Sequence, residues 1–290
     1  ALLGLGASVA DADECFFIVR KGQEWVKILT HVDDFCVVYK GAALYAEVFA
    51  KMKAIFRITD EGELSHFLGV GVQRAPDGAF ELSQTAYIDD LLARLGMADH
   101  GSANIPTKAG SANRLKMRDD LLPEEEAFMH NVPYRQAVGG LFYLARATRC
   151  DISYACSQVS KYMSNPAPQH WHAVRRIYAY LRRTKSIPFR ILANKPRHEW
   201  TTDDLVTWSD ADWAGCRDTT RSHTGWVVRL AGVPVAWYSK KQSFTAQSST
   251  EAEYASAAIA SNETVWWSTL CSDLQIAPAG AFPLRCDNKL

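Results

Sequence analysis

Long hydrophobic runs are missing from this sequence of 290 residues. No stretch approaches the roughly 20 consecutive apolar residues that a membrane-spanning helix needs, which argues against a membrane protein. The seven cysteines are odd in number and include no C-x-x-C pair, which argues against a disulfide framework or a zinc site and for a reducing compartment. Residues 1–6 contain neither an initiating methionine nor a basic segment, which is typical of a cut fragment and not of a signal peptide.

Aromatic residues, in contrast, are plentiful: the chain has 9 Trp, 11 Tyr and 12 Phe. Hydrophobic residues make up 48% of the sequence, which is ample for packed cores. The length is that of about two ordinary domains. Internal repeats and low-complexity tracts are absent from the sequence. These features predict packed domains and not a repeat array.

Acidic residues are nearly absent from the middle of the chain. Residues 130–197 contain 12 Lys/Arg against the single acid Asp151, whereas residues 1–129 contain 13 against 20 and residues 198–290 contain 7 against 11. A net charge of zero therefore hides a basic block, which is typical of a phosphate-binding surface. The alternative is a solvated basic helix face, but tryptophan and tyrosine residues share the block and favour the first interpretation. The arginines expected to form one stripe on a helix are Arg175, Arg176, Arg182 and Arg183.

The spacing of apolar residues predicts alternating strands and helices. Strands are expected over 15–40 with a turn at 20–23, over 63–72 and 80–83 with a turn at 76–78, and over 206–208, 225–230, 233–239 and 282–286. Helices are expected over 43–56, 85–96, 133–147, about 152–163, from 168, and over about 249–274. Polar segments at 99–123 and 193–204 mark boundaries between parts of the chain.

Two adjacent acids, Asp33 and Asp34, interrupt an apolar stretch that runs from residue 28 to residue 38. Apolar runs on both sides of a polar pair predict a tight hairpin with the acids at the bend. Two carboxylates are costly at such a position unless they face water or hold a metal ion. A paired-acid hairpin is a signature of polymerases that use two magnesium ions, so the pair indicates a function on nucleic acid.

A second group of acids lies in the last third of the chain. Asp210 ends a predicted strand, and Asp287 ends the last one. Glu251 and Glu253 open the last predicted helix. Acids at such ends can converge on one edge of a sheet and bind two Mg²⁺ ions roughly 4 Å apart, one to activate water and the other to stabilise the leaving oxygen of a phosphodiester. Oxygen ligands suit magnesium or manganese, and no His or Cys completes a zinc site.

Only one of the two glutamates can face this metal site, because residues two apart on a helix point about 200° apart. Ser248 and Glu251 have the spacing of a capping box, and so do Thr250 and Glu253, so capping alone leaves both possibilities open. Glu253 shares a helix face with the small residue Ala260, which favours Glu253 as the residue that faces the sheet.

Other polar residues of this region have simpler interpretations. Asp212 and Asp218 are typical of turns. His223 lies between Ser222 and Thr224, but no Asp-His-Ser arrangement accompanies it. We therefore interpret His223 as a surface or strand residue without a catalytic role.

These motifs, in their order, resemble those of the polyproteins of copia-type long-terminal-repeat retrotransposons, from the middle of the reverse transcriptase into ribonuclease H. Their order and spacing cover nearly all of the chain. The matching segments are HVDDFCVV (31–38), FLGVGV (67–72), LSQTAYIDDLLARLGM (82–97), YRQAVGGLFYLARATRCDISYACSQVSKYM (134–163), HWHAVRRIYAYLRRTKS (170–186), WSDADWAGCRDTTRSHTGW (208–226), SKKQ (239–242) and SSTEAEY (248–254).

The resemblance implies an α+β or α/β fold in three parts. A partial reverse transcriptase palm is expected over 1–105, with the segment at 67–84 gripping the primer. Thumb and connection helices are expected over 106–197. A ribonuclease H-like mixed sheet with helices, truncated at its C-terminal end, is expected over 203–290.

The resemblance also implies a chemistry and its partners. The ion would be Mg²⁺ or Mn²⁺, held for polymerisation by Asp33 and Asp34, and for RNA cleavage by Asp210, Glu253 and Asp287. Contacts to the backbone of a hybrid are implied for Lys240, Lys241 and Gln242. The partner would be an RNA–DNA hybrid or a primer–template, with the 2′-hydroxyl marking the RNA strand, and no membrane. An intracellular setting follows, either a cytoplasmic particle or the nucleus.

The sequence departs from the family pattern at several points. His31 stands where an aromatic residue is usual, and Cys150 stands where proline is usual. The first catalytic Asp of the polymerase would precede residue 1, and the later His/Asp element of ribonuclease H would follow residue 290. We therefore expect no polymerase activity from this segment and an incomplete nuclease site. One rival interpretation is a non-catalytic nucleic-acid-binding relic of a decayed retroelement. Another is a host-adopted structural protein, but no feature of the sequence favours it.

Overall fold

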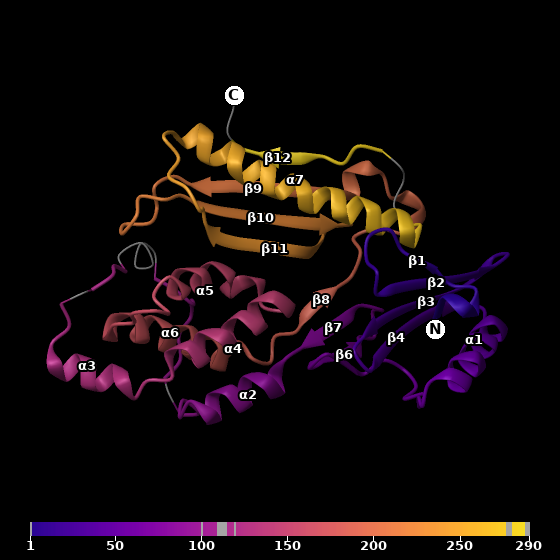
Figure 1. The fold of residues 1–290 in the computed structure, drawn as a ribbon, viewed down its shortest axis with the longest axis horizontal. Coiled ribbons are helices and arrows are strands. Elements are labelled where there is room, and N and C mark those ends of the chain that lie inside the picture. The colour runs from indigo at the N-terminus through magenta and orange to yellow at the C-terminus, as the bar shows by residue number, and fades with distance from the viewer. Residues whose placement is uncertain (1, 100, 109–114, 119, 277–279, 288–290) are drawn as a thin grey trace.

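The computed structural model describes residues 2–99, 101–108, 115–118, 120–276 and 280–287. Within these ranges the chain is a mixed α+β fold with three four-stranded sheets and seven α-helices (Figure 1). None of the described helices is both long enough and apolar enough to cross a bilayer. All seven cysteines are free thiols.

The first sheet, with α1 on one face, forms the N-terminal unit. Its strands, in the order β1-β2-β3-β4, are β1 (Ser8–Val9), β2 (Phe16–Lys21), β3 (Glu24–His31) and β4 (Asp34–Lys40). Helix α1 (Ala42–Ile55) packs on the sheet because Leu44, Val48 and Met52 recur every four residues and so lie on one side of the helix. They bury Val26 and Ile28 of β3. The strands and helix predicted over 15–56 are confirmed.

The second sheet joins two distant parts of the chain. Its strands, in order, are β5 (His66–Phe67), β6 (Val70–Arg74), β7 (Phe80–Ser83) and β8 (Phe189–Ile191). The hairpin between β6 and β7 is confirmed, but the single strand expected over 63–72 is wrong, since Leu68 and Gly69 form a turn at φ 48° and 73°. Strand β8 was not predicted, because three residues are too short for an alternation signal and the partner strand lies far earlier in the chain.

Five helices, most of them from the middle of the chain, build the helical unit. They are α2 (Thr85–Arg94), α3 (Pro123–His130), α4 (Tyr134–Ala147), α5 (Ser153–Ser160) and α6 (Pro168–Thr184). Four of them were predicted, whereas α3 lies in an acidic stretch with little apolar periodicity and was missed. The apolar face of α2 joins the core of α4 and α6, for example through Leu91, Leu141 and Ile177. Helix α2 therefore packs with the later helices, although a boundary predicted at residue 105 separates them in sequence.

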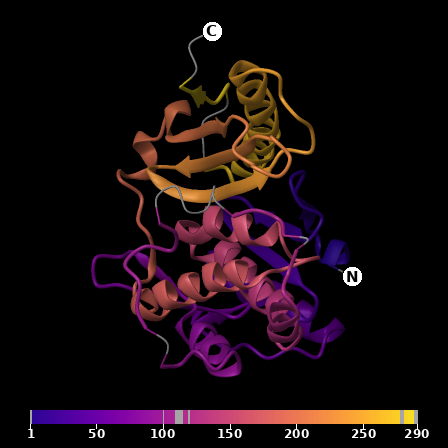
Figure 2. The same cartoon turned by 90° about the vertical axis from the view of Figure 1, so that its left-hand side faces the viewer.

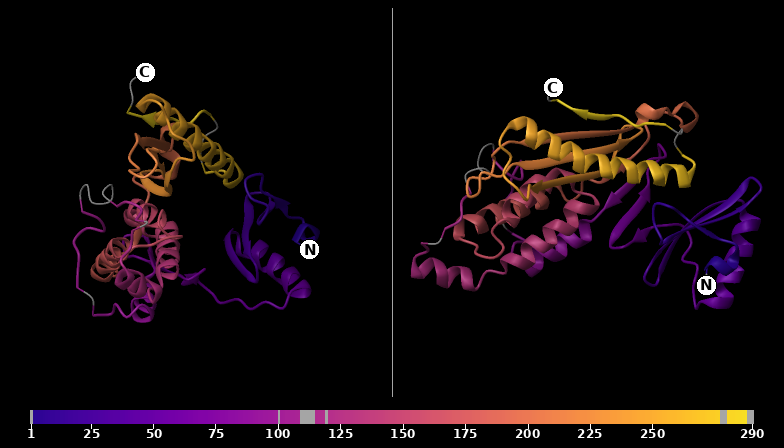
Figure 3. Two further views of the ribbon diagram at one scale, coloured as in Figure 1. Left: turned by 60° about the vertical axis from the view of Figure 1, so that its left-hand side comes forward. Right: turned by 45° about the horizontal axis from the view of Figure 1, so that its top comes forward.

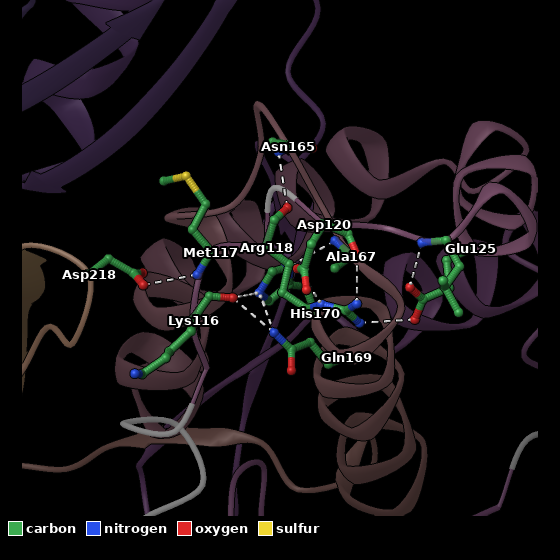
Figure 4. Close-up of polar contacts among 11 residues, drawn as sticks. Lys116, Met117, Arg118, Asp120, Glu125, Asn165, Ala167, Gln169, His170 and Asp218 are labelled. Carbon is green, nitrogen blue, oxygen red and sulfur yellow. Dashed lines mark hydrogen bonds and ion pairs between the residues drawn. The ribbon is translucent and has the colours of Figure 1, made fainter.

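Residues 115–118, before α3, link the start of α6 to Asp218 in the last third of the chain (Figure 4). His170 is fully buried at the start of α6, and its Nδ1 accepts a hydrogen bond from the Ala167 N–H at 2.8 Å. Its Nε2 lies 2.9 Å from the Lys116 carbonyl oxygen, so these partners assign the proton to Nε2. Burial lowers the pKa of His170, which keeps the ring neutral. At the other side of the segment, Met117 N–H donates to Asp218 Oδ1 at 2.9 Å.

The third sheet and α7 form the C-terminal unit. Its strands, in the order β11-β10-β9-β12, are β9 (Leu205–Asp212), β10 (His223–Leu230), β11 (Val233–Lys241) and β12 (Leu284–Cys286). Strands β9 to β11 are antiparallel, and β12 runs parallel to β9. Helix α7 (Ser249–Leu274) lies close to the sheet because small buried residues such as Ser256 and Ala260 face it. The predicted helix over 249–274 and the four predicted strands are confirmed.

The two faces of the third sheet have different neighbours. Helix α7 covers one face, and the helical unit meets the opposite one at β10 and β11 (Figure 2). There, Trp237 Nε1 donates a hydrogen bond to the Ala145 carbonyl oxygen at 2.5 Å. The far end of α7 lies beside the N-terminal unit (Figure 3). There, Lys27 Nζ donates a hydrogen bond to the Leu274 carbonyl oxygen at 2.6 Å. The C-terminal unit therefore contacts both other parts of the structure.

Candidate metal centre

Strand β9 presents its acids on the sheet face opposite α7. Side chains alternate along a strand, so Thr207 and Ser209 face α7 while Asp210 and Asp212 point away from it. The Asp210 carboxylate is exposed, and its backbone oxygen accepts a hydrogen bond from Ser256 Oγ of α7 at 2.7 Å. The helix thus anchors the strand end that carries Asp210.

Glu253 is held at the edge of this sheet. Its side chain is on the second turn of α7, and the residue is only 8% exposed. Its Oε1 accepts the Ala211 N–H at 3.1 Å, and the Cys286 thiol lies 3.3 Å from its Oε2. One ligand atom each from Glu253, Cys286 and Asp287 lie within 4.8 Å of one another. The residues after β12 and the start of α7 thus meet beside the end of β9.

Glu251 caps the start of α7. Its own N–H donates to Ser248 Oγ at 3.1 Å, and its Oε2 accepts the Gln247 N–H at 2.6 Å. These bonds satisfy donors at the start of α7, as in a capping box. Glu251 is exposed and points away from the acids of the sheet, whereas Glu253 faces them.

Several carboxylates of like charge lie close to Glu253. Burial raises the pKa of Glu253, and the charges of Asp210 and Asp287 raise it further against the opposing hydrogen bonds. The pKa of Asp212 is also raised, first by burial and then by Asp210, while Lys161 opposes the shift. Such clusters of partly desolvated carboxylates are typical of functional sites. The oxygen donors fit Mg²⁺ or Mn²⁺, and the Cys286 thiol adds one softer donor.

The exposed acids open into a pocket of about 400 Å³ on the face opposite α7. Its described lining comes from β9, β10, β12 and the residue after β12. The lining residues are Trp208, Ser209, Asp210, Gly225, Trp226, Val227, Arg285, Cys286 and Asp287. The pocket gives a substrate direct access to Asp210 and Asp287.

The first pair of acids lies on another sheet. Asp33 is in the two-residue turn between β3 and β4, and Asp34 is the first residue of β4, opposite His31. Both are exposed, as is Val32, which has φ 52°, a conformation strained for a β-branched residue. The predicted hairpin is confirmed. The structure brings Glu253 and Asp287 together beside Asp210, but it leaves Asp33 and Asp34 on a separate unit.

The predicted cationic contacts differ in their exposure. Arg183 and Lys240 are exposed. The half-buried members of the predicted set are Arg175, Arg176, Arg182 and Lys241. Gln242, in contrast, is buried, and its Nε2 donates to Thr224 Oγ1 at 3.1 Å and to the Ala252 carbonyl oxygen at 3.0 Å. Its side chain therefore bonds inside the fold, and its contact with the backbone of a hybrid stays a prediction.

Several residues at this unit escaped the sequence analysis. His223 does lie on a strand, but it is buried against α5, and the surface position considered for it is wrong. No sequence signal indicates this contact, since α5 is far away in the chain. Trp208, Arg285 and Cys286 beside the acids were also missed, although their positions next to Asp210 and Asp287 in the sequence are a signal.

Comparisons with known proteins place this chain in a family. The family model described as "Reverse transcriptase (RNA-dependent DNA polymerase)" matches residues 2–109, which include Asp33 and Asp34. The Retrovirus-related Pol polyprotein from transposon RE1 of Arabidopsis thaliana is 35% identical over 99% of this chain. The chain belongs to the copia-type retrotransposon Pol polyproteins. It spans about a fifth of that relative, 19% of its length.

Two further relatives also match the chain. The Pol polyprotein from transposon TNT 1-94 of Nicotiana tabacum is 32% identical over 96% of the chain and 20% of its own length. The Uncharacterized mitochondrial protein AtMg00810 of Arabidopsis thaliana is 31% identical over 82% of the chain, and the match covers 93% of that protein. No solved structure matches the chain. The Pol fragment therefore includes a reverse transcriptase region, and its C-terminal acids lie outside the matched family model.

Proposed function

We propose that the C-terminal unit, residues 203–290, is a ribonuclease H-like domain that hydrolyses the RNA strand of an RNA–DNA hybrid with divalent metal ions. One observation carries this proposal: Asp210 and Asp287 line one open pocket, and Asp287 also lies within 4.8 Å of Glu253 and Cys286, counted between ligand atoms. In the same proposal, residues 1–105 belong to the polymerase palm and residues 106–197 to the thumb and connection helices.

Each acid of the pocket has a distinct role. Asp210 and Asp287 are exposed and would hold the metal ions together with Glu253, which lies at the sheet edge. The Ala211 N–H orients the Glu253 carboxylate, and Ser256 holds the backbone of Asp210 in place. Bound Mg²⁺ or Mn²⁺ supplies activation of water and stabilisation of the leaving oxygen. The acids are poorly neutralised without a cation, which supports a metal-binding role.

The N-terminal hairpin would serve the polymerase reaction of the whole polyprotein. Asp33 and Asp34 stand at an exposed tip, where carboxylates can bind metal ions at the end of a primer. The match of residues 2–109 to the reverse transcriptase family supports this role.

A non-catalytic nucleic-acid-binding module is the second candidate. The observation in its favour is the basic block, whose single acid, Asp151, is already paired with Arg149 at 2.7 Å. Arg183 of α6 and Lys240 of β11 are exposed and available for phosphates. This candidate predicts binding that weakens steeply with salt and shows little sequence preference.

Cleavage of a labelled RNA–DNA hybrid in Mg²⁺ tests the first proposal. Any cleavage of the RNA strand by the chain should fall at least about 100-fold in Asp210→Asn, because this change removes one charge from the metal site. Asp203→Asn is the matched control, since Asp203 is an exposed acid of the same unit outside the pocket. Cleavage that persists in Asp210→Asn would contradict the proposal. Salt-sensitive hybrid binding without any cleavage would favour the non-catalytic module.

A further inference from the structure

Arg285 and Trp208 form a pair beside the acids. They are neighbours in the register of β12 and β9, and the Arg285 guanidinium carbon lies 5.0 Å from the centroid of the Trp208 ring. Both side chains are exposed and both line the pocket of Asp210 and Asp287. A guanidinium over an aromatic face is restrained in position while its N–H edge stays accessible. The pair therefore presents donors and an apolar surface toward the pocket.

The register sets the spacing of this pair from the acids. Arg285 precedes Asp287 by two residues, and Trp208 precedes Asp210 by two residues. Residues two apart on a strand share a face and are about 6.6 Å apart. This separation is similar to that of consecutive phosphates along a nucleic-acid strand. A strand with one phosphate at the acids would thus bring its neighbouring phosphate to Arg285.

Gly225 lines the pocket without placing a side chain in it. It lies opposite Asp210 in the sheet and lines the pocket. A Cβ built at Gly225 would meet only the Tyr238 carbonyl oxygen, at 3.9 Å, which is an ordinary contact. The fold itself thus has room for a side chain there. A glycine at this position permits the close approach of a ligand backbone to Asp210.

Arg285 carries the positive charge that a phosphate group needs. Arg285 is exposed and lines the pocket, so a ligand can reach its guanidinium. Guanidinium groups bind phosphate oxygens through two parallel N–H donors, which gives direction as well as attraction. Trp208 offers a face for a sugar or base, whose stacking does not depend on sequence.

We propose that Arg285 and Trp208 form a subsite for the phosphodiester next to the scissile one. Arg285 binds the phosphate, Trp208 packs against the adjoining nucleoside, and Gly225 leaves room for the strand. This subsite rests on the proposed nuclease function, and it adds binding residues that are not metal ligands. It explains why a cation and an exposed indole stand beside a cluster of acids.

Fluorescence anisotropy of a labelled RNA–DNA hybrid tests the subsite. All variants carry Asp210→Asn, which prevents cleavage, and all are measured in Mg²⁺ at several salt concentrations. Arg285→Ala should weaken binding about 5- to 20-fold and lower the magnitude of the salt slope by about one. Trp208→Ala should weaken it by a similar factor, and Arg285→Lys should be intermediate because charge remains without the planar fork.

Control measurements distinguish a loss of hybrid binding at the subsite from unfolding and from a loss of metal binding. Arg217→Ala is the matched control, since Arg217 is exposed in the same unit and does not line the pocket, and it should change binding less than about 2-fold. Gly225→Val should weaken binding while the thermal midpoint stays within a few degrees. Arg285→Ala that binds as Arg217→Ala does would overturn the subsite. Titration of the unmodified chain with Mn²⁺ tests the metal site independently, because its failure would leave an Arg285 effect on hybrid binding intact.

Discussion

His223 Nε2 lies 2.6 Å from Ser157 Oγ, and this contact joins β10 of the C-terminal unit to α5 of the helical unit. Both residues are buried, and Gln158 Nε2 is 3.5 Å from the same ring nitrogen. The ring of Tyr154 stands edge-on to the imidazole, 5.7 Å away. The junction of the two units is therefore a polar network closed to water, and its energy depends on a neutral histidine.

Acid should weaken this junction. Burial, together with the charges of Lys161 and Lys241, lowers the pKa of His223 to about 4, against about 6.5 in an unfolded chain. Between these values the unfolded state binds the extra proton, so stability is present above pH 6.5 and is lost as the pH falls toward 4. At pH 5 the loss is about 2 kcal/mol relative to pH 7. Urea denaturation at a series of pH values measures it.

His223→Gln provides the control for this pH dependence. Glutamine retains hydrogen-bonding capacity but has no charge to gain, so the loss between pH 7 and pH 5 should shrink by about 2 kcal/mol. An unchanged pH profile in His223→Gln would assign the acid sensitivity to other groups.

Neighbouring glycines of α4 should respond in opposite directions to alanine. A Cβ at Gly140 would lie 2.7 Å from Leu91 Cδ2 and 3.2 Å from the Tyr178 hydroxyl, so Gly140→Ala overpacks the core and should destabilise by about 1–3 kcal/mol. A Cβ at Gly139 would meet nothing within 4 Å. Gly139→Ala should therefore stabilise by up to about 1 kcal/mol through helix propensity. Thermal denaturation of both variants checks the contrast, and equal shifts would contradict the packing of α2 on α4.

The contact between the N-terminal unit and the end of α7 should depend on Asp273. Its Oδ2 accepts the Ala12 N–H at 2.9 Å, and its backbone oxygen accepts from Arg20 at 3.0 Å. Asp273→Ala removes the first bond, which should cost about 1 kcal/mol and speed amide exchange around residue 12. Hydrogen exchange with mass spectrometry measures this. Asn262→Ala, on an exposed part of α7, is the control and should leave that exchange unchanged.

Divalent metal should stabilise the C-terminal unit. Burial raises the pKa of Glu253, the charges of Asp210 and Asp287 add to the shift, and a bound cation would relieve the repulsion between these acids. Mg²⁺ at 100 times its dissociation constant should add about 2.7 kcal/mol, which chelation with EDTA removes. Glu253→Gln should be more stable than the unmodified chain in EDTA and should gain little from Mg²⁺. A Mg²⁺ increment that is equal in Glu253→Gln and the unmodified chain would exclude Glu253 as a ligand.

Much of the local structure follows from the sequence. The hairpin of Asp33 and Asp34 has apolar runs on both sides, and α7 has a polar start at Ser248 and a long regular pattern, so both were predicted with nearly correct bounds. The spacing of Ser248 and Glu251 identified a possible cap, but Thr250 and Glu253 had the same spacing. The helix face shared with Ala260 favoured Glu253, and its contacts with the Ala211 N–H, Cys286 and Asp287 place it, and not Glu251, beside the sheet.

The sequence by itself determined the family motifs, most helices and strands, and which acids belong to strand ends and helix starts, because these depend on local periodicity and on residue type. Only the tertiary structure decided which distant segments meet. Strand β8 pairs with β7, His223 is buried against Ser157, and Arg285 stands beside Trp208 in the pocket of Asp210. Such contacts depend on strand register and on the packing of whole units, and neither of these leaves a periodic pattern in the sequence.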